Sequence, residues 1–371
     1  MNAWISAEQM MVVKNKKLLP CNFEEYDIID ISNTTILFCE KNIDFYDKYE
    51  NKKWFKPLCE DEFRNTNSNK KRVFILDTDL NATVNLAFVR LLEHLSDEYV
   101  VRFVKGNSVS KSDFSCVDVV IFIRNLRDSF GYQKICSELN IPMFYYVDDN
   151  FIILSEEIIK GKDAGPIKTF AKLTNYSHLK TFQGVFLSSL ELKNFFETQR
   201  LHENLYLLEP VLNISDKKDV RKKKNIVLAF MGSILRQELF VEVVMPALLR
   251  LNKDFSIQIL CPKLQDNSLL KNFKIDLDIV EFEYTSSVDL LLQEYKKKKP
   301  DILIHCGPEK KNNLYKTENA LLNAVQLDAV LVTSNVLPYS KNISNTNPCF
   351  VVSENTELNW YETLLELCQD V

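Results

Sequence analysis

The chain has 371 residues, of which 46% are hydrophobic and 26% are charged, and its formal net charge is -5. This length allows two domains with large buried cores, at roughly 150 residues per domain. The acidic balance argues against general affinity for nucleic acid. Nine cysteines without a CxxC pair or the His/Cys spacing of a zinc site indicate reduced thiols.

Residues 1–71 are predicted to be an N-terminal extension whose role the sequence does not define. The segment Thr34–Cys39 has the composition of a strand, and Asn65–Lys71 that of a linker. The first residues lack the basic-then-apolar order of a signal peptide, and no run of about 18 apolar residues predicts a spanning helix. We therefore expect a cytoplasmic protein.

Strands and helices alternate from Arg72 onward, which predicts an α/β domain over residues 72–214 with a mostly parallel sheet and right-handed crossovers. The expected strands are Val73–Leu76, Tyr99–Val104, Val117–Ile123, Pro142–Val147 and Gly184–Leu187. The expected helices are Val84–Leu95, Tyr132–Leu139, Ile167–Leu179 and a segment ending at Phe196 that opens on a Ser188-x-x-Glu191 capping box.

Residues 215–224, SDKKDVRKKK, contain almost no apolar side chains. One interpretation is a solvated linker between domains. The other is an electrostatic contact with anionic lipid, because clustered Lys and Arg side chains are attracted to such a surface. The second interpretation predicts a peripheral contact with the inner membrane.

The α/β alternation restarts after this linker and predicts a second domain over residues 225–371. The expected strands are Ile226–Phe230, Ser256–Cys261, Val280–Tyr284, Ile302–His305 and Ala329–Thr333. The expected helices are Gln237–Leu251, Val288–Lys297, Ala320–Leu327 and Trp360–Cys368. Between Ile302–His305 and the helix that opens near Lys316 lies a polar loop. A helix start beside a strand end is an anion site, because unpaired N–H groups and the helix dipole point at it.

The residues after this loop occur in an order that resembles the GT4-like glycosyltransferases (glycosyltransferase group 1). The matching positions are Asn313, Lys316-Thr317, Asp328-Ala329, Ser334 and Pro338-Tyr339. Weaker similarities cover Val73–Arg90, Tyr146–Asn150 and Gly232-Ser233 with Arg236. The resemblance implies a GT-B fold, in which two Rossmann-like doubly wound domains face each other across a cleft.

The resemblance further implies transfer of a sugar from a UDP- or GDP-linked donor to a glycan or lipid-linked saccharide, with retention and without a metal or other cofactor. The diphosphate leaving group needs its growing charge stabilised by prepositioned cations and amides. In this sequence the implied donor-binding residues are Gly232, Ser233, Arg236, Asn313, Lys316, Thr317, Glu318 and Asn323. Lys316 and Arg236 would hold the diphosphate, and Asn323 the ribose.

The sequence departs from that family at two positions. The family has a Glu where this chain has Asn323, and a Gly where it has Asp328. Asn lacks the charge-assisted bond of a carboxylate, which is roughly twice as strong. A second hypothesis is therefore a binding or scaffold protein that keeps the fold without turnover.

Three residues are candidates for catalysis: Asp148, Asp149 and His305. The acidic pair would orient the acceptor hydroxyl or act as a base, and its structural alternative is loop capping. His305 ends a buried strand, and a satisfied core histidine is the alternative. For Lys316 and Arg236 the alternative is a solvated surface charge, and for Glu318 it is an acid that stabilises the first turn of the helix.

A competing motif is Asp77-Thr78-Asp79, which follows a strand as in the HAD phosphatases or a DxD metal site. The HAD pattern requires Thr or Val at the position of Asn81, and it leaves the second domain without a role. A dinucleotide site is disfavoured because the chain has no GxGxxG.

Overall fold

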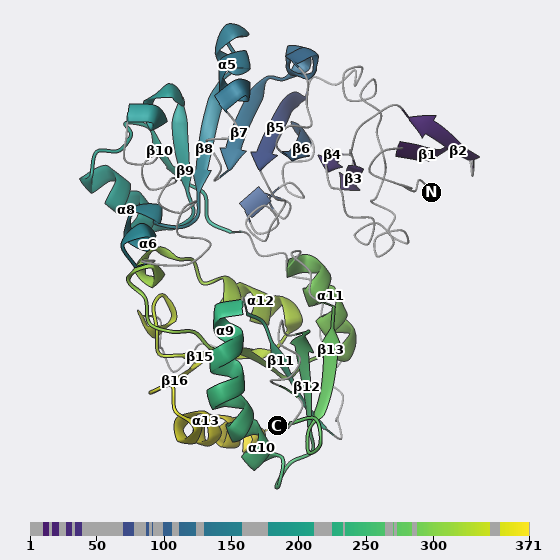
Figure 1. The fold of residues 1–371 in the computed structure, drawn as a ribbon, viewed down its shortest axis with the longest axis vertical. Helices are drawn as coiled ribbons and strands as arrows, with labels where there is room; N and C mark the ends of the chain where they lie inside the picture. Colours follow the sequence, from purple (N-terminus) through teal and green to yellow (C-terminus); the bar gives the residue numbers. More distant parts are fainter. Residues whose placement is uncertain are drawn as a thin grey trace. The chain divides into compact units, whose positions relative to one another are not determined.

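The structure is a computed structural model in two compact units, Met1–Val211 and Leu212–Val371, which we describe separately (Figure 1). It describes residues 10–14, 17–21, 27–31, 34–38, 70–77, 87–88, 91, 99–105, 111–123, 130–157, 177–210, 225–232, 234–263, 270, 273–283, 288–341 and 349–370. The predicted helices Val84–Leu95 and Ile167–Leu179, the two predicted linkers, and Thr78-Asp79 lie wholly or largely outside these residues.

The first unit contains an eight-stranded sheet of order β10-β9-β8-β7-β5-β6-β4-β3, in which only the β3–β4 pair is antiparallel. Its strands are β3 (Asp27–Ile31), β4 (Thr34–Phe38), β5 (Lys71–Asp77), β6 (Tyr99–Lys105), β7 (Val119–Ile123), β8 (Met143–Val147), β9 (Gly184–Leu187) and β10 (Leu205–Leu207). A separate hairpin joins β1 (Met10–Lys14) to β2 (Lys17–Cys21). The strands predicted from Thr34 to Leu187 are confirmed.

The central strand β5 is buried from Val73 to Leu76, as expected for a parallel strand covered on both faces. The described helical segments of this unit are η2 (Lys111–Cys116), α5 (Phe130–Glu138), α6 (Phe151–Glu157), η3 (Ser177–Thr181) and α8 (Leu190–Thr198). The predicted capping box at Ser188 and Glu191 is wrong, because the N-cap of α8 is Ser189 and the residue three positions later is Leu192. Ser189 caps α8 by accepting the Leu192 N–H, whereas Ser188 donates its hydroxyl to the Asp148 carbonyl.

The second unit has a fully parallel six-stranded sheet of order β13-β12-β11-β14-β15-β16. Its strands are β11 (Ile226–Phe230), β12 (Ile257–Pro262), β13 (Asp278–Phe282), β14 (Ile302–His305), β15 (Val330–Ser334) and β16 (Cys349–Val352). Renumbered from the first strand of the unit, this order is 3-2-1-4-5-6, the arrangement of a Rossmann-like nucleotide-binding domain.

Two hydrophobic cores cover the two faces of this sheet (Figure 1). On one face Leu228 and Phe230 pack under the segments α9 (Ile234–Leu239), η4 (Phe240–Val244), α10 (Met245–Leu251) and α13 (Glu357–Asp370). On the other face Val227 and Ala229 pack under α11 (Val288–Lys298) and α12 (Asn319–Leu327). Successive side chains of β11 therefore point to opposite faces of the sheet, and each set packs against different helices.

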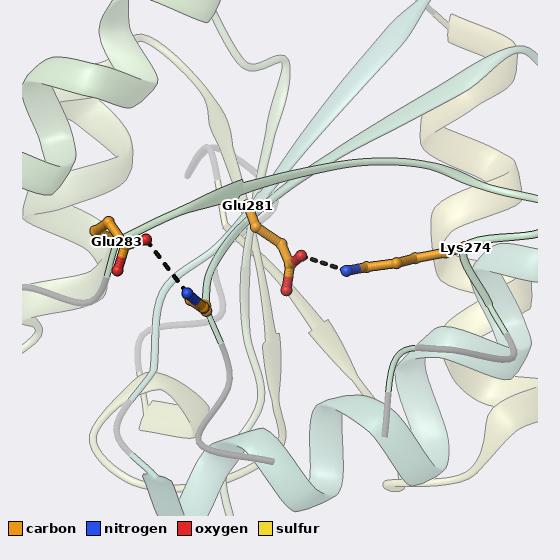
Figure 2. Close-up of polar contacts among 4 residues, drawn as sticks. Lys274, Glu281 and Glu283 are labelled. Carbon is orange, nitrogen blue, oxygen red and sulfur yellow. Dashed lines mark hydrogen bonds and ion pairs between the residues drawn. The ribbon is translucent and has the colours of Figure 1, made fainter. Parts of the chain in front are cut away.

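Two ion pairs lie in and just after the edge strand β13, and Figure 2 shows them. Glu281 pairs with Lys274, and Glu283, just beyond the strand, pairs with Lys263 at 3.4 Å. Charged side chains on an edge strand discourage pairing with another chain. The two ion pairs therefore place charged side chains along this edge of the sheet.

Candidate functional site

The strand order creates a topological switch point between β11 and β14. From β11 the chain moves outward through β12 and β13, and then returns to the other side of β11 as β14. Ligands of open α/β sheets bind outside the carboxyl ends of the strands at such a point. Gly232 follows β11 there, and His305 ends β14.

Gly232 and Arg236 are fixed tightly at this switch point. A Cβ on Gly232 would lie 2.6 Å from the Phe230 ring and 2.9 Å from the Cβ of Arg236, so a larger residue does not fit without a shift. A Cβ on Gly307 would lie 3.6 Å from Arg236 Nε. The half-buried guanidinium of Arg236 therefore lies against Gly307, just beyond the end of β14.

His305 is buried, with 7% of its surface exposed, and packs edge-on against the ring of Tyr339 at a centroid distance of 5.2 Å. Burial lowers its pKa well below 6.5, and the positive charges of Arg236 and Lys316 lower the pKa further. A hydrogen bond with the Met231 backbone opposes this shift in pKa. His305 is consequently neutral near pH 7, and the charges of Arg236 and Lys316 both disfavour its protonation.

The polar loop after β14 contains a 3-10 helix, η5 (Lys311–Tyr315), which the sequence did not predict. Asn313 donates its side-chain amide to the Pro308 carbonyl at 3.1 Å, and its own carbonyl accepts the Lys316 N–H at 3.3 Å. Asn313 is thus a loop-forming residue that places Lys316. Thr317 and Glu318 follow as half-buried residues before α12.

The start of α12 is joined to the same cluster by Tyr339. The Ala320 N–H donates to Tyr339 Oη at 3.1 Å, which satisfies one of the free amides of the first turn. Glu318 is the N-cap residue, but its side chain makes no capping bond. Burial raises the pKa of Tyr339 to about 12, so the phenol stays protonated.

The two departures from the family pattern have different environments. Asn323 is buried on α12, with 6% of its surface exposed. Asp328 ends α12 with φ 61° and ψ 37°, a left-handed conformation that glycine adopts most easily. The backbone conformation at this position therefore explains why the family has Gly there, and Asp adopts the same conformation at some cost in free energy.

Asp148 and Asp149 belong to the first unit, where they follow β8 and are half-buried. The capping bond in this loop comes from their neighbour, because Asn150 Oδ1 accepts the Ile153 N–H at 3.2 Å. Ser233 lies outside the described residues. The structure thus gathers Gly232, Arg236, His305 and Lys316 within one unit.

Sequence reasoning missed Gly307 and Asn355, and it named Ser334 only as a matching position of the family pattern. Gly307 lies under Arg236, and Ser334 and Asn355 hydrogen-bond to the Gly307 backbone. The sequence did contain a signal for Gly307, because a glycine shortly after a buried strand often lies at a binding site. Asn355 gave none, because it lies far along the chain.

In the part of the chain that the structure describes, no group of three or more His, Cys, Asp or Glu side chains is arranged to hold a metal ion. No helix in that part is both long and apolar enough to cross a membrane.

The strand order and the cations at the switch point define a Rossmann-like unit suited to an anionic nucleotide. Solved structures are similar in fold to most of the chain. Sucrose-phosphate synthase from Thermosynechococcus elongatus aligns with a TM-score of 0.58 and 8% identity, over 81% of this chain and 90% of its own. Anabaena HepE, solved with UDP and glucose, aligns with a TM-score of 0.53 and 11% identity over the same shares.

These likenesses show that the chain has the GT-B fold, as the sequence predicted. S. aureus TarM also matches, at 14% identity and a TM-score of 0.47 over 76% of this chain, but this chain spans only 51% of TarM. No protein-family model matches the sequence, and no curated protein matches it.

Proposed function

We propose that this protein is a glycosyltransferase that moves a sugar from a nucleotide-sugar donor to a glycan or lipid-linked saccharide. The observation that carries the proposal is the placement of Arg236 and Lys316 beside neutral His305 at the switch point of a Rossmann-like unit. HepE, which has the same fold, was solved with UDP and glucose, and this supports a nucleoside diphosphate as the ligand.

In this mechanism Arg236 and Lys316 hold the diphosphate of the donor. As the bond to the sugar breaks, negative charge grows on the leaving group, and fixed cations stabilise that charge without reorganisation. His305 stays neutral and adds no third positive charge. Gly232, Ser233, Asn313 and Thr317 shape the loops around the diphosphate, and Asn323 and Glu318 meet the ribose or sugar hydroxyls.

The finer assignments belong to the same proposal. Transfer would proceed with retention and without a metal, and Asp148 or Asp149 would orient the acceptor hydroxyl. Residues 215–224 would supply a peripheral contact with the inner membrane. These assignments are independent of the donor site, so disproving one of them would leave the proposed donor site in place.

A thermal-shift screen against nucleoside diphosphates tests the donor site, because a ligand stabilises the folded protein by RT ln(1 + [L]/Kd). UDP or GDP should raise the Tm, and Lys316→Ala should remove most of that shift. Lys310→Ala is the matched control, since it removes a lysine from the same loop. A Lys316→Ala variant with the wild-type shift would exclude Lys316 from the site.

A second candidate function is a GT-B-like binding or scaffold protein without turnover, and buried Asn323 in place of a Glu favours it. The two functions differ in product. The protein is incubated with UDP-glucose, and free UDP is measured with and without an acceptor. Binding of the donor without release of UDP would favour the scaffold.

A further inference from the structure

The end of β14 is held by side chains where its backbone ladder stops. The last pair in the β14–β15 register is His305 with Thr333. Beyond it, the Thr333 hydroxyl donates to the His305 carbonyl at 2.9 Å, and the Gly307 N–H donates to Ser334 Oγ at 3.0 Å. All of these residues are buried. Two side chains of β15 thus continue the sheet pairing as far as Gly307.

Asn355 closes this arrangement into a ring. Its Nδ2 donates to the Gly307 carbonyl at 3.3 Å, and its Oδ1 accepts the Ser334 hydroxyl at 2.6 Å. The indole N–H of Trp360 also donates to Asn355 Oδ1, at 3.3 Å. The N–H and the carbonyl of Gly307 are therefore both bonded to side chains that lie after β14 in the sequence.

This ring acts on the same residue that lies against Arg236. Because the Gly307 N–H is already bonded to Ser334, it is not a spare donor for a phosphate oxygen. The guanidinium of Arg236 supplies that function, at a position set by Gly307 beneath it. Interactions that hold such a group before the ligand arrives lower the cost of binding.

We propose that Asn355 is a positioning residue, which fixes Gly307 under Arg236 and links the occupancy of the anion site to Trp360. The identity of the ligand as a nucleoside diphosphate rests on the proposed function. The positioning itself requires only that a diphosphate group bind at Arg236.

The test uses the full chain with Trp4 and Trp54 replaced by Phe, so that Trp360 is the only tryptophan. UDP, GDP and inorganic pyrophosphate are titrated by calorimetry, and Trp360 emission is followed in parallel. Asn355→Ala should weaken binding about tenfold, the effect of one hydrogen-bonded contact. It should also abolish the change in emission on binding.

Asn335→Ala is the matched control. Asn335 donates to the Ser353 carbonyl near the same strand ends, but it has no bond to Gly307. This variant should keep both the affinity and the emission change. If Asn355→Ala does not fold, Ser334→Ala breaks the same ring at its other bond to Gly307.

The outcomes separate the two proposals. If Asn355→Ala lowers the Tm but binds all three probes as the parent does, Asn355 has a structural role and the inference is overturned. If pyrophosphate binding falls in that variant while UDP and GDP do not bind even the parent, the positioning stands and the nucleotide-sugar function fails. If the parent binds none of the probes, both are overturned.

Discussion

The two units each hold a buried or half-buried arginine near their sheet, and the two arginines have opposite environments. Arg102 lies within β6 with 1% of its surface exposed, 3.7 Å from Asp113 and with its guanidinium 5.0 Å from the centre of the Phe74 ring. Arg236 lies beyond a strand end, against Gly307 and beside neutral His305. None of the ion pairs among the described residues involves Arg236.

This difference separates a structural cation from a binding cation. The charge of Arg102 is compensated within the first unit by the buried carboxylate of Asp113, 3.7 Å away. The described surroundings of Arg236 contain Gly307 and the neutral imidazole of His305. The charges of Arg236 and Lys316 both act on His305, and those of Arg236 and Glu318 both act on Tyr339. If Arg236 is a binding cation, its ligand is an anion, and the following predictions test this contrast.

The largest effect is expected from Asp113→Asn, which keeps the shape of the side chain but leaves Arg102 as an uncompensated buried charge. Removing one partner of a buried pair costs about 3–5 kcal/mol. Urea denaturation followed by circular dichroism should show this loss in the free energy of unfolding.

The control for that prediction replaces both partners. Arg102→Met with Asp113→Leu should recover most of the lost free energy, since an apolar pair of similar volume is often as stable as the ion pair. Wild-type stability in Asp113→Asn would contradict the assignment of Arg102 as a compensated structural cation.

The second effect is on binding. Arg236→Ala should weaken UDP binding about 100-fold, because hydrogen bonds to charged groups contribute about 1.5–3 kcal/mol each. Its unfolding free energy should change little. Arg250→Ala is the matched control at the other end of the same helical segment, where the guanidinium lies 3.8 Å from the centre of the Tyr361 ring. Equal calorimetric affinities for the two variants would contradict the site.

The third effect is the pH dependence of stability due to His305. Its pKa in the folded protein lies well below 6.5, whereas the unfolded chain takes up the proton near 6.5. Acidification below pH 6.5 therefore favours unfolding by up to about 1.4 kcal/mol per pH unit until the folded pKa is reached. Above pH 6.5 this contribution is constant.

His305→Gln removes that dependence. Thermal unfolding of both proteins from pH 8 to 5 should show a constant difference in Tm down to pH 6.5. Below it, the variant should gain relative to the wild type. The other three histidines are present in both proteins and cancel in the comparison. Parallel curves would mean that the pKa of His305 is the same in the folded and unfolded protein, which would contradict the lowering of its pKa by burial and by the two cations.

Much of the second unit was predictable from sequence, because its parallel strands are uninterrupted apolar runs with polar ends. The strand Ile302–His305 was predicted to the residue. The edge strands β10 and β16 were missed, since they have three and four residues and only one of those seven side chains is fully buried. Ser188 was taken as the cap of α8 because two serines are adjacent, and only the backbone geometry distinguishes them.

The candidate site was predictable in part for a related reason. Arg236 lies in α9, the helix that follows β11, and Lys316 lies in the loop that follows β14, so the pattern of strands places both at one edge of the sheet. Asn355 is 48 residues from Gly307, and two crossovers bring them together. No local pattern carries that information. The ring that holds Gly307 is a property of the fold.

The smallest expected effect concerns Asp328, and it tests whether this departure from the family pattern belongs to stability or to the site. Asp328 adopts φ 61°, where a side chain is strained. Asp328→Gly should raise the free energy of unfolding by about 0.5–1 kcal/mol, and Asp328→Ala should lower it by about 1 kcal/mol. Urea denaturation followed by Trp360 emission measures both. UDP affinity should stay the same in the two variants, because Asp328 lies at the far end of α12 from Lys316. A changed UDP affinity at unchanged stability would instead connect Asp328 to the donor site. It would then also support the hypothesis of a binding protein without turnover.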